Sequence, residues 1–172
     1  MRHHKLTSGS LFALLLLLAL CCRAERRIAV LDFELKDVTP APYIPAEIAR
    51  TASIKPLLEQ ELAKADCRIV QIDPGAIAKA AAGPGYLFDH PDLAAELART
   101  VDADYIVVGR LHKPSYLFIY LMAHLVDVKR GTLIGNYISE VKGGEKKLTL
   151  KGVESLAGKI TATLAENAVS SR

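Results

Sequence analysis

Cysteine is scarce in this chain, with only three among 172 residues. Cys21 and Cys22 directly follow an N-terminal apolar run, so Cys67 is the only cysteine in the rest of the sequence. A single cysteine cannot form an internal disulfide, and we expect the fold to be held by an apolar core. Cys67 opens a short apolar run, and we interpret it as a buried thiol.

Sequence signatures of catalysis, metal binding and cofactor binding are also missing. His90, His112 and His124 lie too far apart for the close spacing that is typical of a metal-binding histidine pair. The Gly-Pro-Gly at residues 83–85 follows no strand and precedes no Lys-Ser/Thr, so it reads as a helix breaker rather than a phosphate loop. No G-x-S-x-G nucleophile elbow occurs. The sequence therefore predicts no catalytic residue, no metal and no cofactor.

The N-terminus carries the three-part pattern of a secretory signal. A short basic stretch precedes an apolar run at residues 11–20, and small residues allow cleavage between Ala24 and Glu25. Even with both cysteines added, the run has about 12 residues, whereas a membrane-spanning helix needs about 20. We expect residues 1–24 to be a cleaved signal peptide. Residues 25–172 would then form one domain that is periplasmic or secreted.

A lipid anchor is the alternative form of export. The segment that ends at Cys21 is similar to a lipobox, although Leu20 stands where a small residue is usual. The alternative is therefore a protein anchored by lipid at Cys21 or Cys22. No second apolar run of spanning length follows, and we expect no membrane span after cleavage.

Neither sign of charge is in excess once the predicted leader, residues 1–24, is removed. The full chain has 22 Lys and Arg against 19 Asp and Glu. Without Arg2, Lys5 and Arg23 the two signs balance, so the basic pI belongs largely to the leader. Nucleic-acid binding needs a basic surface, and we expect no nucleic-acid partner.

Apolar runs separated by turn residues predict an α/β (α+β) fold with a mixed five-stranded sheet and helices packed on it. The order is β-α-β-α-α-β-β-β-α. Crossovers make the first three strands parallel, and the last three form an antiparallel meander whose final, polar strand lies at an edge. The strands are expected at residues 27–35, 68–72, 104–111, 116–128 and 132–142, and the main helices at 46–65, 76–82, from Pro91 onward, and 148–169.

Two connections carry more specific expectations. Pro56 lies inside the helix expected at residues 46–65, and either kinks it or begins a second helix that Ser53 caps. A hairpin centred on residues 114–115 is expected to pair His112 with Leu117.

Three phrases of the sequence resemble a known domain. They are residues 28–34 (IAVLDFE), 103–109 (ADYIVVG) and 126–131 (VDVKRG). Together they resemble the N-terminal domain of TolB and the curli-secretion lipoprotein domain of the CsgG type. The resemblance covers about residues 26–168 and is strongest with exported bacterial proteins of unknown function.

The resemblance implies a non-enzymatic binding or assembly module of the cell envelope. TolB uses this domain in envelope protein contacts, and the curli protein uses it in an oligomeric pore. An envelope or periplasmic protein is therefore the implied partner, and self-assembly is a second implication. An accessory role in a periplasmic oxidation system is a third. We expect such a module to act through a sheet edge or through the proline-rich loop at residues 39–45.

The carboxyl ends of the parallel strands give the alternative, a small-ligand-binding protein or an enzyme. Ligands of open α/β sheets gather beyond these ends, where the chain places polar side chains beside the proline-rich loop. The candidate binding residues are Glu34, Asp37, Asp73, Arg110, His112 and Lys113.

Overall fold

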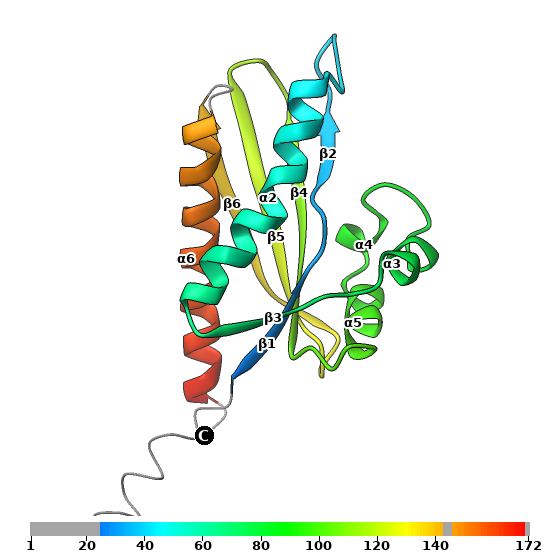
Figure 1. Ribbon diagram of the computed structural model, residues 1–172, viewed down its shortest axis with the longest axis vertical. Helices are drawn as coiled ribbons and strands as arrows, with labels where there is room; N and C mark the ends of the chain where they lie inside the picture. The colour runs from blue at the N-terminus through cyan, green and yellow to red at the C-terminus, as the bar shows by residue number, and fades with distance from the viewer. Residues whose placement is uncertain (1–24, 143–145, 171–172) are drawn as a thin grey trace, which may run out of the picture.

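In the part of the chain that the structure describes, six strands form a single mixed sheet and five helices pack on its two faces (Figure 1). The computed structural model describes residues 25–142 and 146–170. The predicted leader, residues 1–24, lies outside the described residues. The strands are β1 (Arg26–Val30), β2 (Glu34–Asp37), β3 (Cys67–Val70), β4 (Tyr105–Lys113), β5 (Phe118–Asp127) and β6 (Thr132–Lys142); the helices are α2 (Pro45–Lys64), α3 (Pro74–Ala80), α4 (Tyr86–Asp89), α5 (Pro91–Arg99) and α6 (Lys146–Ser170).

The sheet has the predicted mixture of parallel and antiparallel pairs. Its order is β3-β1-β4-β5-β6, and β2 also pairs with β4. The strands β1, β3 and β4 are parallel, as are β2 and β4, whereas β4, β5 and β6 form an antiparallel meander. The polar strand β6 lies at the edge, which confirms that expectation. Gly131 closes the β5–β6 turn with a positive φ of 67°.

The first predicted strand, residues 27–35, is wrong as a continuous element. The chain leaves the sheet after β1 and returns as β2. Both strands pair with the same side of β4, one after the other along its length. Between them the ring of Phe33 covers Gly109, where a Cβ atom would collide with it. This packing displaces the chain from the sheet between the two strands. The sheet therefore has six strands but only five strand positions, because β1 and β2 share the position next to β4. The short helix α4 is a second element that the predicted order lacked.

The β4–β5 register also differs from the expected one. His112 pairs with Tyr120 rather than with Leu117, because the turn is longer than a two-residue hairpin. The Oγ of Ser115 accepts hydrogen bonds of 3.3 Å from the main-chain N–H groups of Leu117 and the residue after it. These bonds hold a wider loop before β5 begins.

A single helix, α2, runs through Pro56. Ser53 does not cap a second helix, because its Oγ donates to the carbonyl of Arg50. A proline inside a helix costs about 3 kcal/mol. Burial of Ile54 before the proline and Leu58 after it continues one apolar face, which offsets this cost.

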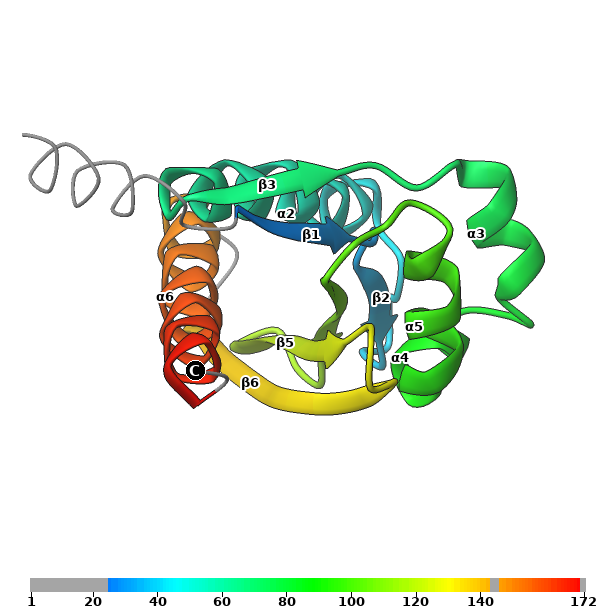
Figure 2. The same ribbon diagram turned by 90° about the horizontal axis from the view of Figure 1, so that it is seen from below.

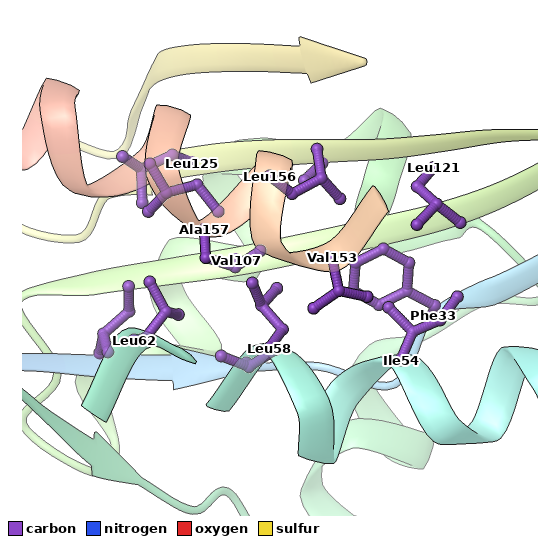
Figure 3. Close-up of a cluster of buried hydrophobic side chains, with 14 of the residues drawn as sticks. Phe33, Ile54, Leu58, Leu62, Val107, Leu121, Leu125, Val153, Leu156 and Ala157 are labelled. Atoms are coloured by element: carbon purple, nitrogen blue, oxygen red, sulfur yellow. The ribbon is translucent and has the colours of Figure 1, made fainter. Parts of the chain in front are cut away.

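Helices α2 and α6 cover one face of the sheet, and α3, α4 and α5 lie on the other (Figure 2). The larger core joins α2 and α6 to the sheet; Figure 3 shows its side chains meeting between the helices and the strands. Cys67 belongs to this core, and burial raises the pKa of its thiol. Within the described residues, every helix is too short or too polar to span a bilayer.

Candidate functional site

Strand β4 directs its last two basic side chains to opposite faces of the sheet. Successive side chains of a strand alternate, so Arg110 and Lys113 point to different faces. Arg110 lies on the face of α4, and Lys113 lies on the face of α2. The predicted rim residues are therefore divided between two clusters.

The first cluster surrounds Lys113 and is almost completely buried. The Nζ atom of Lys113 lies 3.1 Å from Glu47 Oε1 and 3.6 Å from Asp37 Oδ2. The side chains of Lys113, Asp37 and Glu47 are 4%, 0% and 6% exposed. Arg50 binds the second carboxylate oxygen of Glu47 at 3.1 Å. One lysine thus joins the ends of β2 and β4 to the first turn of α2.

Asp37 also organises the proline-rich loop. Its Oδ1 atom accepts hydrogen bonds from the N–H and the hydroxyl of Thr39, at 3.0 and 2.7 Å, and its Oδ2 accepts one from the N–H of Tyr43 at 3.3 Å. Tyr43 has a positive φ of 59°, which this bond helps to hold. Burial raises the pKa of Asp37, but the bonds from Thr39 and the charge of Lys113 outweigh it, so the pKa lies below its ordinary value.

The second cluster surrounds Arg110 and is partly open to water. The Nε atom of Arg110 donates to Glu34 Oε2 at 2.6 Å. The Nη2 atom of Arg110 lies 3.3 Å from Asp89 Oδ2. Asp89 is 61% exposed, whereas Arg110 and Glu34 are mostly buried. Burial lowers the pKa of Arg110, but these two acidic partners outweigh it and raise the pKa.

Arg110 also holds the short helix α4. Its guanidinium lies 4.3 Å from the centre of the Phe88 ring, whose other neighbour is the stacked ring of His124 at 3.9 Å. His124 Nδ1 lies 3.0 Å from the carbonyl oxygen of Phe88. Burial, together with the charge of Arg110, lowers the pKa of His124. Gly85, with φ at 73°, leads the chain into α4 close to Arg110 and Glu34.

Two of the six predicted residues lie outside these clusters. Asp73 caps α3, with its Oδ2 accepting from the N–H of Ala76 at 2.9 Å. His112 faces Tyr120 across the sheet, with 6.4 Å between ring centres. Within the described part of the chain, His112 Nδ1 is buried without a hydrogen-bond partner. The structure thus brings together Asp37 with Lys113 and Glu34 with Arg110, and it brings neither Asp73 nor His112 into these pairs.

Sequence reasoning missed the two helix-borne partners of these cations. Glu47 lies in the first turn of α2, where an acidic residue is common for reasons of the helix dipole alone. Asp89 ends α4, an element too short to be recognised from periodicity. A signal for Glu47 was nevertheless present, since it falls on the same helix face as the buried Thr51 and Leu58.

A groove lies between β2 and the N-terminal half of α2. It has a volume of about 400 Å³ and is open to solvent. We call it the β2 groove; its lining residues are Asp32, Phe33, Leu35, Tyr43, Ile48, Thr51 and Ala52. The lining is mostly apolar, and Tyr43 and Ile48 are more than half exposed. The proline-rich loop thereby supplies one wall of this groove through Tyr43.

The outer edge of β2 borders this groove. Among the described residues, β4 is the only strand that pairs with β2, because β3 pairs with β1 alone. The N–H of Val38 donates to the carbonyl of Lys113, which fixes the alternation along β2. Glu34, Lys36 and Val38 therefore direct their main-chain groups towards β4. Leu35, which lies between Glu34 and Lys36, directs its N–H and C=O outward. Within the part of the chain that the structure describes, no strand pairs with the outward donor and acceptor of Leu35.

The family of the chain follows from its sequence match. Residues 26–160 match DUF3280, described as "Protein of unknown function (DUF2380)". The chain belongs to this family. No curated protein matches it. No group of three or more His, Cys, Asp or Glu side chains within residues 25–142 and 146–170 is arranged to hold a metal ion.

Solved structures show the same fold at low sequence identity. The PelC dodecamer from Paraburkholderia phytofirmans is 18% identical with a TM-score of 0.50, over 81% of this chain and 86% of that one. Lipoprotein GNA1162 from Neisseria meningitidis is 13% identical with a TM-score of 0.50, over 78% and 95%. TolB from Acinetobacter baumannii is 13% identical with a TM-score of 0.49, over 81% and 28%. The similarities to PelC and to GNA1162, both with a TM-score of 0.50, establish a shared α/β fold.

Proposed function

We propose that this protein is a non-enzymatic binding module of the cell envelope that takes up an extended segment of a partner protein beside β2. The observation that supports the proposal most strongly is the outer edge of β2, which pairs with no other described strand and lies next to an apolar groove. An exposed strand edge binds an extended peptide through main-chain hydrogen bonds, and neighbouring pockets select its side chains. This is the sheet-edge and proline-loop mode of binding that the sequence led us to expect.

The groove defines the chemistry of the bound segment. The main-chain N–H and C=O of Leu35 would bind one residue of the partner strand. Every second side chain of that strand would point into the groove, towards Phe33 and Ile48. We therefore expect a partner segment with apolar residues at alternate positions.

The two ionic clusters support binding rather than catalysis. Glu34 and Asp37, the two acidic residues of β2, each bind a cation of β4 on opposite faces. Fixed in this way on both sides, β2 keeps its conformation before the partner arrives, which lowers the entropic cost of binding. The same contacts engage four of the six residues that would otherwise serve a ligand site.

A proline substitution tests the main-chain bond directly. Leu35→Pro removes the outward N–H and leaves the bonds of β2 to β4 in place, because an edge strand tolerates proline where its N–H faces outward. Leu35→Ala shortens the same side chain but keeps the N–H, and is the matched control. A photo-reactive amino acid at position 48 would report the partner in the envelope of producing cells.

We expect a discrete cross-linked product with the otherwise unchanged chain and with Leu35→Ala, and its loss with Leu35→Pro. Equal unfolding free energies of the two Leu35 variants would show that the fold is kept. A product that persists in Leu35→Pro would contradict strand addition at β2.

A second copy of the chain is one form that the partner can take. The solved PelC structures are dodecamers, and the PelC fold resembles that of this protein. In that form the cross-linked product would have twice the mass of the chain, and Leu35→Pro would reduce the mass measured in solution by light scattering.

A further inference from the structure

Exposed apolar side chains gather at one end of the molecule. Nine large apolar residues of the described chain are exposed, and seven of them lie on the β2–α2 connection, at the start of α2, on the β4–β5 turn or at the first residue of β5. Figure 1 shows these segments at the end where α6 begins. Two of the seven line the β2 groove. The other five, which we call the apolar end, are Val38, Ile44, Tyr116, Leu117 and Phe118.

The apolar end is a built surface rather than two unconnected loops. The N–H of Val38 donates to the carbonyl of Lys113 at 3.1 Å, and the Nζ atom of Lys113 lies 5.3 Å from the centre of the Tyr116 ring. The Oγ of Ser115 accepts a hydrogen bond from the N–H of Leu117 in the following turn, and Leu117 is 69% exposed. The buried ionic cluster beneath therefore fixes the position of both loops.

Basic residues border the apolar end. Lys142 pairs with Phe118 across the sheet, and Lys146 and Lys147 begin α6 at the same end. Together with Lys36 on β2, these segments contain four lysines. The acidic residues that the sequence places beside them are two, Glu140 and Glu145. The chain from residue 25 onward is neutral as a whole, so this end is more basic than the rest.

We propose that the apolar end docks on the surface of an anionic lipid bilayer. Tyrosine and bulky apolar side chains on projecting turns suit the interface between headgroups and acyl chains, and bordering lysines are attracted to anionic lipids. Each lysine near such a surface contributes roughly a fivefold gain in affinity.

A second copy of the chain fits this end poorly. In a symmetric dimer the same patch would meet itself, and the lysines of both copies would be brought together. A bilayer carries the complementary charge instead. This inference goes beyond the proposed function and rests on different residues, so either can fail without the other.

The absence of tryptophan from the chain allows a direct test. Leu117→Trp places a single fluorophore at the apolar end. Leu133→Trp places it at another exposed leucine, 41% exposed, on the β5–β6 hairpin at the opposite end of the sheet. About eight residues of strand separate the two levels, which is roughly 26 Å. The domain from residue 25 onward would be mixed with vesicles of phosphatidylglycerol, or of phosphatidylcholine alone.

We expect phosphatidylglycerol vesicles to shift the emission of Leu117→Trp to shorter wavelength and to leave Leu133→Trp unchanged. Replacing Lys142, Lys146 and Lys147 together by glutamate should lower the affinity at least a hundredfold, and Leu117→Asp should abolish co-sedimentation where Leu133→Asp does not. Absence of binding, equal shifts at both positions, or equal binding to both lipids would overturn the proposal. Binding only to a soluble acidic polypeptide such as polyglutamate would overturn it in favour of a protein partner.

Discussion

Arg110 and Lys113 stand three residues apart on β4 and perform the same task on opposite faces of the sheet. Each binds one carboxylate of β2 and one carboxylate of a helix: Glu34 and Asp89 for Arg110, Asp37 and Glu47 for Lys113. The two sites differ in their access to water. The Lys113 site is almost completely buried, whereas the Arg110 site includes a largely exposed partner.

This difference decides what each cation contributes. A charge in a dry site cannot lose its partner without a large cost, because water does not replace the lost contact. An exposed carboxylate regains water when its partner is removed. We conclude that Lys113 is needed for the end of β2 and the start of α2 to fold together. Arg110, with its stacked Phe88, mainly positions α4.

Removing the buried cation should have the largest effect. Lys113→Met leaves Asp37 and Glu47 buried and facing each other, so we expect a loss of about 3–5 kcal/mol in the free energy of unfolding. Urea titration followed by circular dichroism measures this loss. Lys142→Met, at a lysine that is 78% exposed, is the control and should change the value by less than about 0.5 kcal/mol. Similar losses for both variants would remove the distinction between the two sites.

Removing the partly exposed cation should cost less. Arg110→Gln leaves Glu34 mostly buried without its strongest partner but frees Asp89 to water, and we expect a loss of about 2 kcal/mol. Arg130→Gln removes an arginine that is 64% exposed from its pair with Asp127 and serves as the control, with a loss below about 1 kcal/mol. If Arg110→Gln destabilised the protein more than Lys113→Met, the ranking by burial would be wrong.

A glycine beside the Arg110 site sharpens the comparison. Gly85→Ala places a side chain at a positive φ and against Arg110 and Glu34, and we expect a loss of about 1 kcal/mol. Gly83→Ala, where no atom lies within 4 Å of the added Cβ, is the control. Thermal unfolding of both variants would measure the difference. No difference between them would mean that α4 is not held against Arg110 as the structure shows.

The smallest expected effect is a dependence of stability on pH at the α4 face. The pKa of His124 is lowered in the folded protein, so the unfolded chain binds a proton first as the pH falls. The contribution of His124 is therefore fully present above its ordinary pKa of 6.5, and it is lost as the pH falls towards its folded value. His124→Gln should flatten this part of the curve of unfolding free energy against pH. An unchanged slope would assign the dependence to another group.

Much of the fold could be predicted because it depends on patterns that lie close together in sequence. Apolar runs predicted the number of strand positions in the sheet. The lengths of the connections predicted which strands are parallel and which are antiparallel. Pro91 correctly indicated the start of α5, and Gly131 the β5–β6 turn. The break at Phe33 could not be predicted, since it depends on contact with Gly109, some 76 residues later.

The six predicted rim residues stay a prediction as a binding site, and the sequence did not indicate how they are arranged. Four of the six rim residues do form ionic contacts, yet they form two sites because strand alternation divides them between faces. Their partners Glu47 and Asp89 come from helices whose placement depends on tertiary packing. The unpaired edge of β2 had no local signal at all, because it depends on where β3 ends relative to β1.

Amide hydrogen exchange along β2, followed by nuclear magnetic resonance, measures how firmly each side of this strand is hydrogen-bonded. Strand β2 is fixed to β4 on its inner side, while no described strand pairs with its outer edge. The amide of Lys36 should therefore exchange at least a hundredfold more slowly than that of Leu35, and Lys113→Met should remove the difference. Equal protection of the two amides in the unchanged protein would contradict the account, because the edge would then be either paired on both sides or not held at all.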